Sequence, residues 1–103
     1  MNKKILAASL VGLFICSGLV QAADIDAGKT KAAVCAGCHG ADGIAVNPVW
    51  PNLAGQNVDY FVAQIKAFKV GNRKNELMSP MAQTLSDEDA ANIAAYFYSL
   101  GKK

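Results

Sequence analysis

The chain has 103 residues, of which 52% are hydrophobic, and its formal net charge is +2. This length allows one small domain, and the charge balance excludes a strongly basic nucleic-acid binder and a disordered tail. The basic excess comes from Lys3 and Lys4, because residues 23–103 carry equal numbers of basic and acidic side chains. A folded part this short buries little surface, and domains of this size often need an additional stabilising link, such as a disulfide bond or a structural metal.

Residues 1–22 have the pattern of a secretory signal peptide. A short basic head precedes the apolar run from Ile5 to Val20, and small residues follow at the positions of a cleavage site. The run, which contains Cys16, is short for a transmembrane helix. We therefore predict that residues 1–22 are a cleaved signal peptide and that 23–103 form the working domain. That domain would be located in the periplasm, without a membrane span.

Three helical stretches are predicted in the working domain, separated by loops rich in glycine, proline and asparagine. The first runs from about Asp26 to Cys38, with an acidic N-terminus. The second runs from about residue 57 or 58 to Val70, because apolar residues recur there at spacings of three and four, and Gly71-Asn72 ends it.

The third helix begins after Ser86, whose spacing to Asp89 matches a capping box. Its apolar stripe includes Ile93 and Phe97, and Gly101 ends it. The stretch between the second and third helices is expected to be a loop. No segment alternates like a strand, so the sequence predicts an all-α fold of three main helices.

The residues that carry chemistry are concentrated in Cys35-Ala36-Gly37-Cys38-His39, which contains the only histidine of the chain. A C-x-x-C-H run is the attachment signature of c-type haem. Residues three and four apart share a helix face, so two thiols can reach two vinyl groups of one porphyrin while the imidazole reaches the iron. A redox disulfide would be expected after a strand, and structural zinc needs four ligands.

A haem iron held by one histidine needs a sixth ligand or an open site, and methionine is the choice for electron transfer. The working domain offers Met78 and Met81, both before the last helix. Core filling is the ordinary role of a methionine, and the residues by themselves do not separate the two.

The haem motif is followed by a Pro-Asn-Leu-Ala-Gly-Gln segment, a Met-Ser-Pro-Met segment, and Leu-Ser-Asp-Glu-Asp before the last helix. In this order, over nearly all of residues 26–100, the sequence resembles the class I c-type cytochromes, in particular the small bacterial periplasmic monohaem proteins and one half of the related dihaem cytochromes. The resemblance implies the cytochrome c fold, with long loops wrapped around one covalently bound haem c and its iron.

The resemblance also implies roles for individual residues. Cys35 and Cys38 would form the haem thioethers, and His39 would be an axial ligand of the iron. Met78 would be the other axial ligand, because it lies eight residues before the capping Ser86, with Met81 as the second choice. The carbonyl of Pro48 would accept the hydrogen bond from the Nδ1 proton of His39. The first and last helices would cross at Gly28, Ala32, Ala94 and Tyr96 or Phe97. The haem propionates would be contacted by Arg73, Lys74 and Asn75, and the pocket wall or core would contain Trp50, Leu53, Tyr60, Phe61, Ile65 and Phe68.

These residues predict an electron carrier that is not an enzyme and that docks transiently, as a monomer, with redox partner proteins at an exposed haem edge. It would bind no nucleic acid. Two alternatives are a haem subunit of a larger dehydrogenase and a gas-binding or ligand-binding haem protein with an open iron site. Basic side chains that would surround the edge are Lys29, Lys31, Lys66, Lys69, Arg73 and Lys74.

Overall fold

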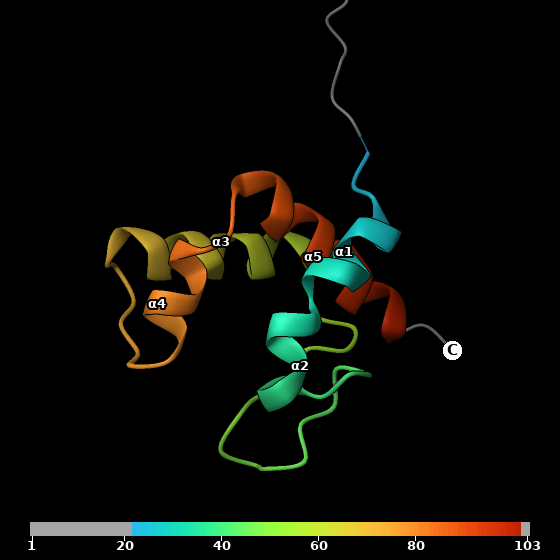
Figure 1. Ribbon diagram of the computed structural model, residues 1–103, viewed down its shortest axis with the longest axis horizontal. Helices are drawn as coiled ribbons and strands as arrows, with labels where there is room; N and C mark the ends of the chain where they lie inside the picture. Colours follow the sequence, from blue (N-terminus) through green and yellow to red (C-terminus); the bar gives the residue numbers. More distant parts are fainter. Residues whose placement is uncertain (1–21, 102–103) are drawn as a thin grey trace, which may run out of the picture.

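The computed structural model describes residues 22–101, and in this part the regular structure is entirely helical (Figure 1). The predicted signal peptide therefore lies, except for residue 22, outside the described residues. The helices are α1 (Ile25–Lys31), α2 (Ala33–His39), α3 (Val58–Val70), α4 (Met78–Gln83) and α5 (Asp87–Leu100). The all-α prediction is confirmed. Within residues 22–101, no helix is long and apolar enough to cross a membrane.

The predicted first helix is interrupted at Ala32 and forms two short helices. The side chain of Asp24 caps α1 by accepting from the backbone N–H of Ala27. At Ala32 the backbone has φ −67° and ψ −7°, and its carbonyl accepts from the N–H of Cys35, which tightens the turn. Ala32 is itself buried in the core. The interruption gives α2, which carries the haem motif, a direction different from that of α1 (Figure 1).

The second and third predicted helices, α3 and α5, begin and end where their caps predict. Asn57 accepts from the N–H of Tyr60 at the start of α3, and Gly71, with φ 87°, ends it. At the start of α5, Ser86 and Asp89 form the predicted capping box, with bonds of 2.9 and 3.0 Å. Both starts depend on a side chain three residues from its partner, which explains why the sequence alone locates them.

The prediction of a loop between these helices is wrong in part, because residues 78–83 form α4. Just before this helix, the side-chain oxygen of Asn75 accepts from the backbone N–H groups of Leu77 and Met78 and so shapes the turn that leads into it. Pro80 favoured a loop in the sequence, but it lies in the first turn, where a missing N–H costs no helical hydrogen bond.

The core lies between α1, α3, α4 and α5. Phe97 and Ile93 of α5 are its largest fully buried side chains, and the ring of Phe97 lies 6.1 Å from that of Phe61. The predicted crossing of α1 and α5 is formed by Gly28, which lies against the backbone of Asn92. Among residues 22–101, the buried apolar residues of the core are Ala32, Phe61, Ile65, Phe68, Ala82, Leu85, Ala90, Ile93, Ala94 and Phe97.

Candidate functional site

The three residues of the haem motif that carry chemistry all lie on α2. Cys35 and Cys38 are free cysteines and are partly buried, while His39, the last residue of the helix, is only 7% exposed. Helical spacing places the two thiols three residues apart and the imidazole four residues from Cys35. The structure therefore keeps these side chains together at the end of one short helix.

The ring of His39 is oriented by Pro51. Its Nδ1 lies 2.8 Å from the Pro51 carbonyl oxygen, and since a carbonyl can only accept, Nδ1 carries the proton and Nε2 keeps the lone pair that binds a metal. The prediction that the carbonyl of Pro48 accepts this hydrogen bond is therefore wrong. Pro48 lies in an exposed turn in which the N–H of Trp50 donates to the Asn47 carbonyl, and the chain reaches His39 only after that turn.

The loop that carries Pro51 is held by backbone hydrogen bonds within the loop and by one to α5. The carbonyl of Gly43 accepts from the N–H groups of Leu53 and Ala54, and the N–H of Gly55 donates to the carbonyl of Phe97. Gly43 has φ 79°, and a Cβ there would lie 2.7 Å from the backbone nitrogen of Ala54, so the close approach needs glycine. These ties hold the Pro51 carbonyl over α2.

The pKa of the Cys35 thiol is raised, which favours the neutral form of this group. Burial, and then the charge of the neighbouring Cys38, raise the pKa of Cys35 to about 11. A thiol that stays protonated at neutral pH resists oxidation and disulfide exchange, because the thiolate is the reactive form. The microenvironment is thus unlike that of a redox-active C-x-x-C pair, whose attacking thiol has a lowered pKa.

Of the two candidate methionines, Met78 is the one that packs against the apolar core. It is the first residue of α4, is partly buried, and contacts the same core cluster as Cys35 of the haem motif. Met81 lies one turn further along α4 and is also partly buried. In the view of Figure 1, α2 and α4 both lie on the same side of α3.

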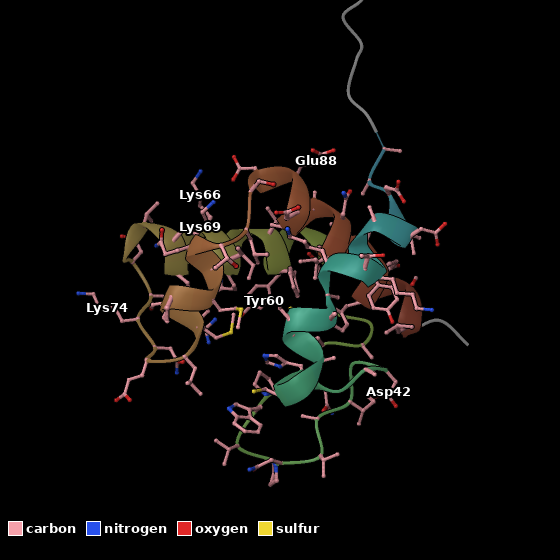
Figure 2. The ribbon with its side chains drawn as sticks, in the orientation of Figure 1. Asp42, Tyr60, Lys66, Lys69, Lys74 and Glu88 are labelled. Atoms are coloured by element: carbon pink, nitrogen blue, oxygen red, sulfur yellow. The ribbon has the colours of Figure 1, made fainter. Side chains whose placement is uncertain are left out.

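Half of the basic side chains expected around the site are engaged elsewhere. Lys31 pairs with Asp89 at 3.6 Å, and Lys69 donates to the carbonyl of Leu85. Arg73 donates to Gln64 at 2.7 Å and lies 4.6 Å from the centre of the Phe68 ring. Figure 2 shows Lys66 and Lys69 on the side of α3 away from α2, with Lys74 pointing outward. The amino groups of Lys66 and Lys69 therefore lie away from the helix that carries the haem motif.

The expected pocket-wall residues divide between core and surface. Phe61, Ile65 and Phe68 are buried in the core, and Leu53 is partly buried against it. Tyr60 is 51% exposed. A contact that was not expected from the sequence joins the site to α5: the Tyr96 hydroxyl donates to the carbonyl of Ala41 over 3.2 Å. Its partners are 55 residues apart, so no local pattern indicates it.

The donor set fits a covalently bound haem. Two free thiols three residues apart, followed by a buried imidazole whose Nδ1 is already bonded, offer two attachment points and one axial nitrogen. In the part of the chain that the structure describes, no group of three or more histidine, cysteine, aspartate or glutamate side chains could hold a metal ion. A protein-only zinc site, the alternative considered from the sequence, has no support in that part.

The comparisons with known proteins agree with this chemistry. The family model described as cytochrome c oxidase, cbb3-type, subunit III, matches residues 23–97. Cytochrome c-554(548) of Halomonas halodenitrificans is 51% identical over 81 residues, covering 76% of this chain and 98% of that protein. Cytochrome c4 of Pseudomonas aeruginosa is 47% identical over 100 residues, covering 96% of this chain.

The chain spans only about half the length of that second relative, 49%. The crystal structure of reduced recombinant cytochrome c4 from Pseudomonas stutzeri superposes with a TM-score of 0.71 at 42% identity, covering 76% of this chain and 46% of that one. The chain therefore has the all-α cytochrome c fold that the sequence predicts. Membership of this family implies a covalently bound haem c with its iron. The chain belongs to the matched family and is a class I c-type cytochrome.

Proposed function

We propose that this cytochrome carries single electrons between redox partners on one haem c, attached through Cys35 and Cys38 and ligated by His39 and Met78. The observation that supports this most directly is the fixed, buried imidazole of His39 beside two free thiols. Met78 supports it because its side chain packs on the same core cluster as Cys35. When bound, the haem supplies a one-electron ferrous–ferric couple.

The residues of this chain would keep the ligand geometry constant during electron transfer. The Pro51 carbonyl holds the His39 ring and strengthens it as a ligand. The burial of His39 and the packing of Met78 limit the access of water. A thioether ligand, these outer hydrogen bonds and burial are the means by which a protein sets a haem reduction potential.

We further propose a periplasmic monomer that is not itself an enzyme and that meets its partners transiently. The loop after α2 supports a docking role, because its apolar side chains stand in solvent beside the haem motif, with Ile44 49%, Val49 76% and Val46 97% exposed. This apolar loop, rather than a basic ring from α3, is the surface we expect redox partners to meet.

The experiment that tests the function uses the purified haem-loaded protein. We expect a covalent haem by mass and pyridine haemochrome, a reversible one-electron couple, and in the ferric state the weak far-red band of methionine ligation. A ferric protein without that band, binding exogenous ligands readily at neutral pH, would instead be a ligand-binding haem protein. Size-exclusion of the native protein separates a free carrier from a subunit of a larger dehydrogenase.

The ligand assignment is tested by the matched pair Met78→Ala and Met81→Ala. Met78→Ala should lose the far-red band, lower the reduction potential and open the iron to imidazole, because the thioether that raises the potential is gone. Met81→Ala should keep the band. The reverse pattern would identify Met81 as the ligand.

A further inference from the structure

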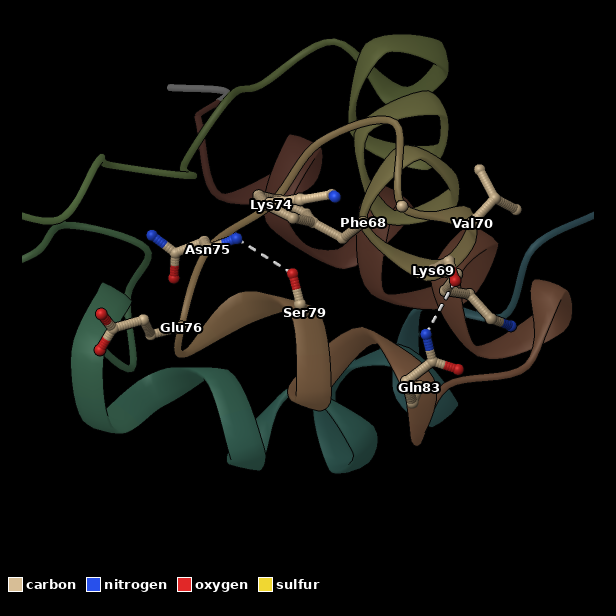
Figure 3. A pocket seen from close by; sticks show the side chains of 9 residues that line it. Phe68, Lys69, Val70, Lys74, Asn75, Glu76, Ser79 and Gln83 are labelled. Atoms are coloured by element: carbon tan, nitrogen blue, oxygen red, sulfur yellow. Dashed lines mark hydrogen bonds between the residues drawn. The ribbon is translucent and has the colours of Figure 1, made fainter.

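A groove of about 570 Å³ lies between the end of α3, residues 71–76 and α4. Figure 3 shows two hydrogen bonds along its walls, one at each end of α4. At the far end, the side-chain nitrogen of Gln83 donates to the carbonyl oxygen of Lys69 over 2.8 Å. Lys69 in turn sends its own ammonium group past α4 to the carbonyl of Leu85, at 2.5 Å. Together, these two hydrogen bonds form a clamp between the end of α3 and the C-terminal end of α4 with the link that follows it.

The clamp supplies hydrogen-bond donors to two backbone carbonyl groups, those of Lys69 and Leu85. Lys69 lies in the last turn of α3, where carbonyl groups have no partner within the helix. Leu85 is buried in the three-residue link between α4 and α5, and its carbonyl accepts a hydrogen bond from the charged Lys69. Hydrogen bonds with a charged partner are stronger than neutral ones. The clamp therefore joins α3 to the last residue of α4 and to the link that follows it.

At the other end of α4, Asn75 makes local hydrogen bonds, and at that end the side chain of Met78 packs against the core. The Asn75 side chain accepts from the N–H of Met78 at 2.9 Å, and the Asn75 N–H donates to the hydroxyl of Ser79 at 3.0 Å. These bonds shape the start of the helix but do not attach it to α3. A helix of six residues is also too short to be stable alone, so its position depends on contacts with the rest of the fold.

We propose that Lys69 and Gln83 are positioning residues for Met78. By clamping α4 to the end of α3 they hold the helix that carries Met78 at a fixed place relative to the core, and so keep the thioether in reach of the iron. This inference rests on the proposed function in one respect, the assignment of Met78 as an axial ligand.

The test measures how readily imidazole displaces the methionine in the haem-loaded ferric protein. Lys69→Leu and Gln83→Leu each remove a donor while keeping apolar bulk. Each variant should bind imidazole about five-fold more tightly than wild type, the factor that corresponds to one ordinary hydrogen bond, with a weaker far-red band. Lys69→Arg keeps a charged donor and should restore the band. The matched control is Lys66→Leu, an exposed lysine on the same helix, which should behave as wild type.

The outcomes separate the clamp from the ligand assignment. A wild-type protein without the far-red band would overturn the Met78 assignment and this inference with it. A normal wild-type band, together with unchanged imidazole affinity in the variants, would overturn the clamp alone, even if their free energies of unfolding fell. If Lys69→Leu does not fold, Gln83→Leu decides, because Gln83 is exposed and its loss leaves the core intact.

Discussion

Gly28 of α1 lies directly against the backbone of Asn92 in α5, so that a Cβ at position 28 would overlap the Asn92 carbonyl group. The same pair of helices is joined by a hydrogen bond of 2.8 Å from the backbone N–H of Asp24 to the side-chain oxygen of Asn92. The crossing depends on this contact, because two helix backbones can approach so closely only where one residue has no side chain.

Gly28→Ala should therefore destabilise the holoprotein, although alanine favours helices. The added methyl group meets backbone rather than a movable side chain, and overpacking of this kind costs about 1–3 kcal/mol. Urea unfolding of the haem-loaded protein measures the change. The control is Gly37→Ala in α2, where a Cβ meets nothing within 4 Å. Equal stability of the Gly28→Ala variant and wild type would contradict the close crossing.

Pro51, and not Pro48, should control the order of the His39 ring. Pro51→Ala keeps the carbonyl but frees the backbone that aims it, at a cost of about 0.4–1 kcal/mol. The Nδ1 proton of His39 should then exchange with solvent faster, by about two- to five-fold on the same basis, as measured by NMR of the ferrous protein. Pro48→Ala, in the exposed turn, should leave this exchange unchanged. The opposite result would restore Pro48 as the partner.

Acid should weaken the start of α5 through Asp89. The hydrogen bond from the N–H of Ser86, helped by Lys31, holds the pKa of Asp89 below its ordinary 3.8. Because the folded pKa is lowered, this contribution to stability is present above the unfolded pKa and is lost as pH falls through the folded value.

Asp89→Asn keeps an acceptor for Ser86 but removes the charge. It should be less stable than wild type at pH 7, and the difference should shrink as the pH falls through the lowered folded pKa of Asp89. Urea unfolding across this range measures it. A difference that stays constant with pH would exclude the charge as its cause. Ser86→Ala, which removes the cap itself, should cost about 0.5–2 kcal/mol.

Covalent attachment should fail without the thiols of α2. Replacing Cys35 or Cys38 by alanine should reduce haem loading, and the double variant should lose covalent haem, as measured by the mass of the chain and the haemochrome spectrum. Cys16→Ala, which lies in the predicted signal peptide, is the matched control and should load normally. Full covalent loading of the double variant would refute thioether attachment.

Features that depend on short spacings along the chain could be predicted before the fold was known. The caps of α3 and α5 lie three residues from their partners. The haem motif spans only the five residues 35–39. Such patterns are visible in the sequence because the interacting groups are close along the chain. The all-α class follows from the same local periodicity.

Contacts between residues far apart in the chain became visible only in the folded structure. The interruption at Ala32 accompanies burial in the core, and α4 is attached to α3 by Lys69 and Gln83, 14 residues apart. The carbonyl that reaches His39 belongs to Pro51 because the intervening loop turns at Asn47 and is tied to Gly43. These contacts form only when distant parts of the chain come together. The entropy lost in closing the intervening loop, and the interaction energy gained in return, cannot be read from a local sequence pattern.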